Sequence, residues 1–564
     1  GRARRPSGAV GQRPRRADSI VFPRLGGMQK EPARRLAQTV MGDERVAALA
    51  RARDTMGSDS QGFSGRKGVA MDRVLASMKD EGVFAARAAW SDCLGEQATS
   101  ADAECLDIPL PSDVVRLKEA GRLRDAARVC RAALDRAEVP EVAARLRLEL
   151  YRLARLGSQY CVTEEEALKQ LSKECPGISY DDLERLKAAG RIDWRIIEGE
   201  VRYLPSVIDG LRAYAAEVPG LAPAVRDQAP RRALRAEMAR VGGASRRITV
   251  RASMEVTDAA PEETVRIWLP LAVDAAQQRS VEVLDVSPGA RISASDAQAR
   301  TAYWEFAGPG ARSITYRYRI DAPYIDLWSA EGIEAARAAY ESGVAAPLPA
   351  PTEDDLAELP PHVRFSPIVD AVARHIHQQA SSDDPLEVAR AVYLWVTGNV
   401  DYRYQPAYLY LDGIVDYALS GLRGDCGVMA LVFVTLCRRL GIPARWQSGL
   451  YSAPDDIGPH DWALFYTPST GWAWADCSFG SSSRRMGDEE RRRFFFGNLD
   501  PWRTVLCQRY QAVFDPVGPG VRIDPYDNQI GEATVGERSV DAGSYVRSVE
   551  LLGMEELPWE DSAV

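Results

Sequence analysis

The fold of the carboxy-terminal half of the chain is indicated most clearly by the stretch Leu422–Arg445, which reads LRGDCGVMALVFVTLCRRLGIPAR. Its long apolar run, followed by Gly441 and Pro443, predicts a buried helix that ends at this glycine. Cys426 stands where the preceding loop gives way to the helix. The positive end of a helix dipole stabilises a thiolate, so this position favours a lowered thiol pKa and a nucleophilic role. The alternative interpretation is a small buried thiol with no reactivity.

A second cysteine, Cys437, lies eleven residues further along the same predicted helix. That separation is about 16 Å along a helix, whereas a disulfide requires α-carbons within roughly 7 Å. We therefore predict that Cys437 is a core residue and not a disulfide partner of Cys426. Gly424 and Gly427, on either side of Cys426, would let a substrate approach the backbone closely.

A nucleophilic thiol needs a general base, and the chain has four histidines. His460 opens HDWALFY, whose alternation predicts a strand with His460 and Trp462 on one face. The spacing after Cys426 leaves room for a helix, a turn and one further strand, which could return His460 to the helix end. The other histidines fall in a proline-rich linker or on a predicted helix, and we interpret them as surface or packing residues: His362, His375 and His377.

An imidazole base needs a third group that fixes its orientation. Asp476 ends a second predicted strand, in PSTGWAWADCSFG, and the two strands can form a hairpin. Residues directly opposite in a hairpin share a face, so we expect His460 to meet Asp476 only if the pairing is centred on Pro468. A tighter turn at Ser469–Gly471 would leave them about four residues out of step. The alternative is that both are surface strand residues beside a tryptophan-rich face.

Three motifs occur in a fixed order: GDCGVMALVFVTLCRRLGIPARWQSG, HDWALFY and GWAWADCSFG. Together they resemble the transglutaminase-like superfamily, whose core carries a papain-like Cys-His-Asp triad. The resemblance covers roughly residues 367–480 and includes Gly-Ile-Pro-Ala-Arg and His-x-Trp. It implies that Cys426 is the nucleophile, His460 the general base and acid, and Asp476 the orienting carboxylate. The later stretch RRRFFFGNLDPWRTV and a preceding β-rich domain are similar to bacterial members of the superfamily.

Other site residues follow less directly from this resemblance. The backbone N–H of Cys426 is the natural first oxyanion donor, and Tyr404 or Gln405 is a candidate for the second. We also predict substrate-binding positions at Gly427 and Trp462.

The sequence departs from the superfamily pattern in two ways. Many members have proline after the triad aspartate, where this chain has Cys477. We expect Cys477 to be structural, because neighbouring strand residues point to opposite faces. No calcium-binding loop is evident, so the calcium-dependent animal enzymes are a poor guide and we predict no cofactor.

Changes in periodicity divide the chain, and the length of 564 residues is consistent with roughly three or four domains. The predicted class is α+β, with a helical amino-terminal region, a β-sandwich-like middle domain and a transglutaminase-like, papain-like carboxy-terminal core. The predicted boundaries are residues 1–70 for a disordered basic arm, 71–245 for the helical region with a degenerate winged-helix-like module at 162–204, 246–330 for the sandwich, 331–520 for the catalytic domain and 521–564 for a carboxy-terminal extension.

Charge and composition narrow the classes of partner. The net charge of -9 and the acidic residues Asp181, Asp182 and Glu184 in the winged-helix-like module argue against a nucleic-acid surface. No apolar run is long enough to cross a membrane and no signal peptide is evident, so we expect a cytoplasmic protein without membrane contact. The nine cysteines form no CxxC pair and no metal pattern with the histidines.

These observations predict a thiol acyl-transfer enzyme that acts on a protein or peptide. Cys426 would attack an amide carbonyl, and the resulting thioester would pass to water, as in a peptidase, amidase or deamidase, or to an amine, as in cross-linking. The resemblance favours hydrolysis. A non-catalytic scaffold with a relic triad is the alternative from another class, and the sequence leaves the oligomeric state open.

Overall fold

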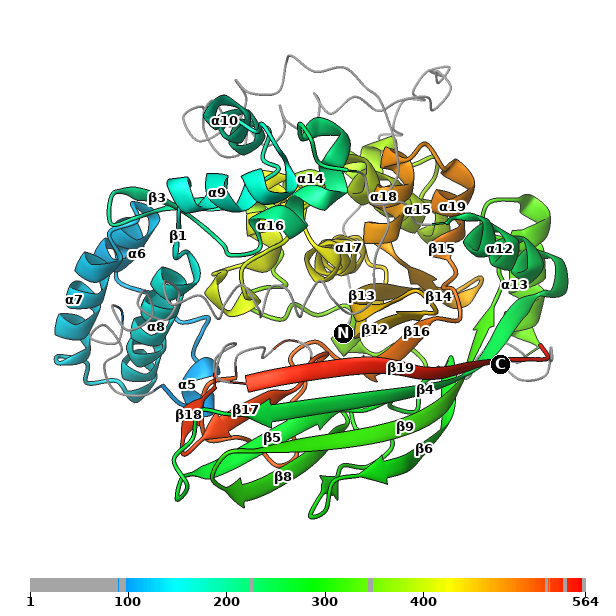
Figure 1. Cartoon of the computed structure of the whole chain (residues 1–564). Coiled ribbons are helices and arrows are strands. Elements are labelled where there is room, and N and C mark those ends of the chain that lie inside the picture. The colour runs from blue at the N-terminus through cyan, green and yellow to red at the C-terminus, as the bar shows by residue number, and fades with distance from the viewer. Residues whose placement is uncertain are drawn as a thin grey trace, which may run out of the picture.

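The computed structural model describes residues 90, 98–222, 227–342, 348–522, 526, 528–540 and 545–559. Within these residues the chain is α+β, as predicted, with helices, a β-sandwich and a mixed carboxy-terminal core (Figure 1). The predicted basic arm, residues 1–70, lies outside the described part of the chain.

The described chain begins with helices whose apolar faces pack together. The longest of them carries buried leucines at helical spacing, which explains why it lies against its neighbours and against the carboxy-terminal core. Their bounds are α5 Ser100–Ala103, α6 Ser112–Glu119, α7 Leu123–Leu134 and α8 Pro140–Gln159.

Two helices and a short antiparallel hairpin follow, in the range 162–204 for which the sequence predicted a winged-helix-like module. Thr163 and Ser179 cap its two helices through capping boxes, and the hairpin turns at Gly199, whose φ is 86°. A separate apolar cluster holds the module together. Its elements, with those that follow, are β1 Val162–Thr163, α9 Glu164–Glu174, α10 Tyr180–Ala188, β2 Trp194–Ile197, β3 Glu200–Tyr203, α11 Val207–Leu211, η2 Arg212–Glu217 and α12 Ala229–Val241.

Two facing antiparallel sheets form the sandwich at the bottom of Figure 1. The longer strands in the first part of the sandwich lie at residues 243–323, and one face of each packs in a common apolar cluster. They are β4 Gly243–Val256, β5 Thr264–Pro270, β6 Gln278–Val286, β8 Thr301–Ala307 and β9 Gly310–Pro323, joined by the short β7 Arg291–Ile292.

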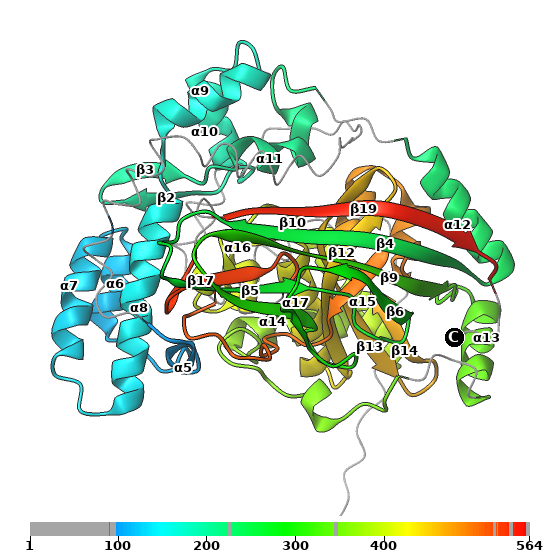
Figure 2. The ribbon, with the colours of Figure 1, turned by 60° about the horizontal axis from the view of Figure 1, so that its bottom comes forward.

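The carboxy-terminal segment differs from the predicted extension, because it completes both sheets of the sandwich. β17 (Glu532–Val535) pairs with β5, and β19 (Tyr545–Leu557) pairs with β4 along the whole strand. β18 (Arg538–Ser539) pairs with β17. The sandwich is therefore discontinuous in sequence, and Figure 2 shows the first and last parts of it side by side.

A five-stranded antiparallel sheet, ordered β15-β14-β13-β12-β16, forms the centre of the carboxy-terminal core. Helices cover one face of it, and the other face carries Trp462, Leu464 and Trp474 in a separate apolar cluster. Leu450 and Leu506 join the sandwich cluster. The bounds are α13 Ala330–Glu341, η3 Glu353–Asp355, α14 Pro367–Gln379, α15 Pro385–Asn399, β10 Asp401–Tyr402, η4 Tyr408–Tyr410, α16 Ile414–Gly421, β11 Arg423–Gly424, α17 Cys426–Arg439, β12 Ala444–Ala453, β13 Asp456–Thr467, β14 Gly471–Ala475, α18 Cys477–Arg485, α19 Glu489–Phe494, β15 Phe496–Gly497 and β16 Arg503–Cys507.

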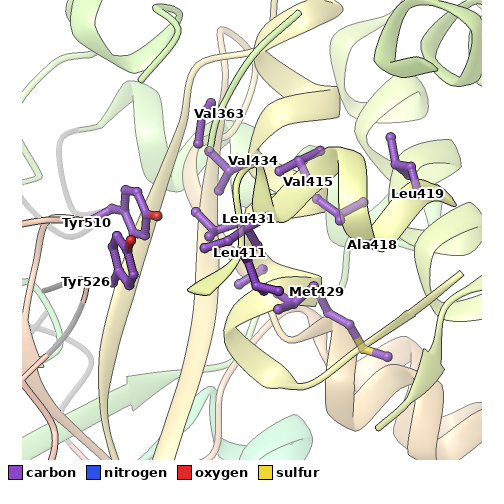
Figure 3. Packing of buried hydrophobic residues seen from close by; sticks show 14 of the residues in the cluster. Val363, Leu411, Val415, Ala418, Leu419, Met429, Leu431, Val434, Tyr510 and Tyr526 are labelled. Carbon is purple, nitrogen blue, oxygen red and sulfur yellow. The ribbon is translucent and has the colours of Figure 1, made fainter. Parts of the chain in front are cut away.

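The central helix α17 confirms the prediction made from Leu422–Arg445. It begins at Cys426, and Gly441 follows its carboxyl end with a positive φ of 79°. Twelve of its residues are buried, so it packs on all sides (Figure 3). Met429, Leu431 and Val434 contribute to the largest apolar cluster of the protein. This packing fixes the amino end of α17, and with it the position of Cys426.

Candidate active site

Cys426 is the first residue of α17 and is partly buried. The helix is capped by Asp425, whose Oδ1 accepts a hydrogen bond from the Val428 N–H at 3.1 Å and another from the Tyr408 hydroxyl. The cap is itself an anion, so its charge offsets the positive end of the helix dipole. The helix position alone therefore does not create an electropositive site for the thiol.

The thiol of Cys426 donates its hydrogen bond to Asp461 Oδ2 at 3.1 Å. Burial raises the pKa of Cys426 well above its ordinary value, and the charges of Asp461 and Asp425 raise it further. The sequence-based expectation of a lowered pKa is wrong for this conformation, because desolvation and two carboxylates outweigh the helix dipole. In this conformation the raised pKa favours the neutral form of the Cys426 thiol.

His460 and Asp476 form the second pair of the site. His460 Nε2 lies 2.7 Å from Asp476 Oδ2, and both side chains are buried. Asp476 also caps α18, where its Oδ1 accepts from the Phe479 N–H at 2.9 Å. The pair therefore joins β13 to the start of a helix that follows β14.

The hairpin register differs from both registers considered for it. Thr467 pairs with Gly471 across a three-residue loop, Pro468–Thr470, so the pairing is centred on residue 469 and not on Pro468. Asp476 then follows the last paired residue of β14 and lies diagonal to His460. Diagonal neighbours on one face are within reach of longer side chains. The prediction that the two residues meet only when directly opposite was too strict.

A buried arginine, Arg503 of β16, holds Asp476 from the other side. Arg503 Nη1 lies 2.8 Å from Asp476 Oδ2, and its Nη2 lies 3.2 Å from Asp500 Oδ2. The guanidinium is fully buried and packs over the Phe479 ring at 4.3 Å. Arg503 lies in the stretch RRRFFFGNLDPWRTV. The sequence predicted no role for this arginine.

These contacts set the charge states of the pair. Although burial disfavours its charge, the pKa of Asp476 is held well below its ordinary range by His460 and Arg503. Burial lowers the pKa of His460, and the nearby Arg503 charge acts in the same direction, while Asp476 opposes them. We conclude that the pair rests as a carboxylate and a neutral imidazole.

The three predicted triad residues are thus arranged as two hydrogen-bonded pairs. In the described parts of the chain no hydrogen bond joins Cys426 to His460. The thiol is hydrogen-bonded to Asp461, the residue that follows His460 in the sequence. His460 and Asp461 are adjacent on β13, so their side chains project from opposite faces of the strand and the two pairs lie on opposite sides of it. Among the described residues the His460 ring is therefore not placed against the Cys426 thiol in this conformation, and Nδ1 is the ring nitrogen that is not bonded to Asp476.

The lower-ranked site predictions divide into two groups. Gly427 is confined: a Cβ there would lie 2.5 Å from the Tyr408 hydroxyl oxygen and 3.0 Å from Asp461 Oδ2. Tyr404 is 41% exposed, and its pKa is raised by burial and by the charges of Asp209 and Cys426.

Gln405 and Trp462 do not have the predicted geometry. The Gln405 amide donates to the Arg403 carbonyl at 2.7 Å, so it is already engaged. Trp462 is fully buried, with its indole N–H donated to Gln447 Oε1 at 2.8 Å. Trp462 is thus buried and its one polar hydrogen is already donated, so it is a packing residue in this conformation.

Cys437 and Cys477 are buried thiols in the apolar cluster around α17. Burial raises the pKa of each well above its ordinary value. Cys477 starts α18 and is not a strand residue, so the geometric reason given for its structural role was wrong although its burial is clear.

Gln529, from the segment between the core sheet and β17, is hydrogen-bonded to both His460 and Asp461. Its Nε2 donates to the His460 carbonyl at 3.0 Å and to Asp461 Oδ1 at 2.9 Å. Sequence reasoning gave no signal for it.

Across the described residues, no group of three or more His, Cys, Asp or Glu could hold a metal ion, and none of the described helices is long and apolar enough to span a membrane.

The family model described as the transglutaminase-like superfamily matches residues 370–477. Among solved structures, a candidate cysteine protease from Cytophaga hutchinsonii is 15% identical, with 57% of this chain and 95% of that chain covered and a TM-score of 0.33. The periplasmic domain of TgpA from Pseudomonas aeruginosa is 14% identical, with 45% of this chain and 95% of that chain covered and a TM-score of 0.23. No curated protein matches. With TM-scores this low, the two structures add nothing to the assignment made by the family model.

Proposed function

Because residues 370–477 form a core of the transglutaminase-like superfamily, we propose that the chain is a cysteine enzyme that transfers acyl groups from amides. The observation that carries the proposal is the buried His460–Asp476 pair, backed by Arg503, within a family core whose central helix begins at Cys426. A buried imidazole oriented by a carboxylate is the arrangement that thiol catalysis uses to move a proton.

The reaction has two steps. After a rearrangement that brings the His460 ring to the thiol, the Cys426 sulfur attacks an amide carbonyl while its proton passes to His460 Nδ1, and the C–N bond then breaks as His460 returns the proton to the departing amine. The product of this step is a thioester on Cys426. In the second step water, activated by His460, hydrolyses the thioester and releases a carboxylic acid.

The oxyanion of the tetrahedral intermediate needs donors close to Cys426. The Cys426 N–H is the first of these, because the start of a helix leaves its amides without intrahelical partners. Tyr404 is the better candidate for the second donor, since it is exposed and its pKa is raised by burial and by the charges of Asp209 and Cys426. The Gln405 amide is bonded elsewhere.

Hydrolysis is our first proposal for the fate of the thioester, with a protein or peptide as substrate. Transfer to an amine, as in cross-linking, follows from the same thioester when an amine replaces water. The scaffold alternative predicts no turnover. The cytoplasmic location, the absence of nucleic-acid partners and the absence of a cofactor stay predictions.

Intact mass spectrometry tests the proposal. The wild-type protein and Cys426→Ala are each incubated with a peptide library and methylamine, and the peptides are weighed. We expect cleavage or the small mass gain of deamidation with wild type, amine incorporation if transfer competes with water, and neither with Cys426→Ala.

The matched control is Cys437→Ala, which removes a buried thiol from the same helix and should keep the activity. Identical peptide profiles for wild type and Cys426→Ala would refute the enzyme proposal, and the scaffold alternative would then be favoured.

A further inference from the structure

Asp461 is a buried carboxylate placed against the thiol of Cys426. It is 3% exposed, and its Oδ2 accepts the hydrogen bond from Sγ at 3.1 Å. Its Oδ1 accepts from Gln529 Nε2 at 2.9 Å. Since both oxygens accept hydrogen bonds, the contacts fit the ionised, acceptor-only form of the side chain.

This contact opposes the ionisation that attack by the thiol requires. When Cys426 loses its proton, the thiolate lies beside the Asp461 carboxylate and no longer donates to Oδ2. Asp425 at the helix cap adds a second negative charge. Other titratable groups that face Cys426 include the phenols of Tyr402 and Tyr408, which carry no positive charge. Like charges in a site with little water are poorly screened, so a cation at Asp461 would favour the reactive state.

Two buried polar side chains, one paired with Asp461 in the sheet and one adjacent to Gln529 in sequence, lack a protein partner among the described residues. Ser448 lies directly opposite Asp461 in the β12–β13 register, so the two side chains project from one face of the sheet. Ser448 is fully buried, and among the described residues its Oγ has no hydrogen-bond partner. Asn528, beside Gln529, is 1% exposed and its amide atoms likewise lack partners there. Buried polar atoms of this kind are costly unless a ligand or water satisfies them.

We propose that Asp461 and Ser448 form a recognition site for a primary ammonium group located next to the acyl carbon that Cys426 attacks. The inference rests on the proposed function, since it names the substrate class of the same site: an amide next to a lysine side chain or a free amino terminus. An ammonium has three donors, which suit Asp461 Oδ2 and Ser448 Oγ together. Its charge replaces the thiol hydrogen bond at Asp461, and the thiol proton passes to His460.

Charged thiol reagents test this recognition without turnover. Wild-type protein is treated with 2-aminoethyl methanethiosulfonate, which is cationic, and with 2-hydroxyethyl methanethiosulfonate, which is neutral and of matched size. The rate at Cys426 is read from the peptide mass and divided by the rate of each reagent with N-acetylcysteine. We expect the cationic reagent to be favoured by roughly tenfold or more. Equal normalised rates would overturn the proposal.

Three variants locate the effect. Asp461→Asn should bring the normalised ratio close to one, whereas Asp285→Asn, which removes an exposed carboxylate of the sandwich, should leave it unchanged. Gln529→Ala keeps the Asp461 carboxylate and should keep the preference. A ratio that survives Asp461→Asn would contradict the assignment. If Asp461→Asn fails to fold, the wild-type ratio still decides.

The outcome is separable from the proposed function. A missing charge preference at Cys426, with turnover that still depends on Cys426, refutes only the ammonium site. Turnover that persists in Cys426→Ala refutes the proposed function, whatever the reagents show. In the peptide library, substrates with a lysine or a free amino terminus beside the reacting amide should be consumed first, and consumption of acidic peptides at the same rate would contradict the inference.

Discussion

Two buried carboxylates, Asp476 and Asp461, lie on either side of the active-site strand β13 and are held in opposite ways. Asp476 is fully buried between the imidazole of His460 and the guanidinium of Arg503. Asp461 is buried almost as completely, but the partners resolved for its two oxygens are a thiol and an amide. Asp476 is thus paired with nitrogen groups that carry or can take up positive charge, whereas the partners of Asp461 include two neutral donors, a thiol and an amide.

The difference separates two tasks. The groups around Asp476 stabilise its negative charge, so this carboxylate stays ionised and orients His460. The Asp461 side meets the reacting atom and disfavours its thiolate until the local charge changes. A catalytic base is thus prepared in the resting structure, whereas the nucleophile is not, and substitutions on the two sides should have different signatures.

Asp476→Asn should give the largest effect on turnover. The amide keeps the shape of the side chain but cannot stabilise the imidazolium or its tautomer, so we expect kcat to fall by roughly 10²–10⁴. Steady-state kinetics on a peptide found in the library screen measures this. The contrasting variant is Asp461→Asn, which should change the preference among substrates more than the rate on a neutral one. A rate for Asp476→Asn within a few-fold of wild type would contradict the orienting role.

Arg503→Met should give the largest effect on stability. It leaves Asp476 and Asp500 without their shared buried cation, which typically costs about 3–5 kcal/mol. Denaturant unfolding measures the change. The matched control is Arg317→Met, which removes an exposed ion pair with Glu282, 41% and 59% exposed, and should cost about 0–1 kcal/mol. Similar losses in both variants would show that Arg503 is not held by the buried charges.

The pH dependence of stability should reveal the neutral His460. Burial lowers the pKa of His460 in the folded state, so its stabilising contribution is present above the unfolded pKa of about 6.5 and is lost as the pH falls below it. The melting temperature of wild type should therefore fall more steeply than that of His460→Gln between about pH 7.5 and about pH 5. His362, which is also buried, is present in both proteins and cancels. Parallel curves would argue against a buried neutral imidazole.

Trp462→Phe should give the smallest effect. The substitution removes the hydrogen bond to Gln447 and little apolar volume, so we expect a loss of about 1–2 kcal/mol in unfolding free energy. Because Trp462 has no exposed surface, KM should not change. A rise in KM with unchanged stability would restore the substrate-binding role predicted from the sequence.

The sequence predicted what local pattern determines. The helix α17 and the strands of the hairpin follow from apolar periodicity and from the residues that end each element. The register did not, because Thr467 and Thr470 bond to each other across the turn and set a loop that neither considered register contained.

Contacts between segments that are far apart in the sequence could not be predicted from it. Arg503, Gln529 and the strand β19 meet the rest of the molecule only through the tertiary fold. β19 also lies at a sheet edge with much of its length exposed or half-exposed, so its apolar alternation is weak. No role was predicted for Asp461, because the pattern in HDWALFY indicated roles for His460 and Trp462, which lie on the other face of the strand.

Trapping the acyl-enzyme tests the central claim most directly. A peptide substrate from the library screen is mixed with wild-type protein, the reaction is stopped in acid within its first turnovers, and the peptide that contains Cys426 is weighed. We predict an added mass equal to the acyl part of the substrate, on Cys426 alone, which hydroxylamine removes. Turnover without an adduct on Cys426, or an adduct that persists on another residue in Cys426→Ala, would contradict the account.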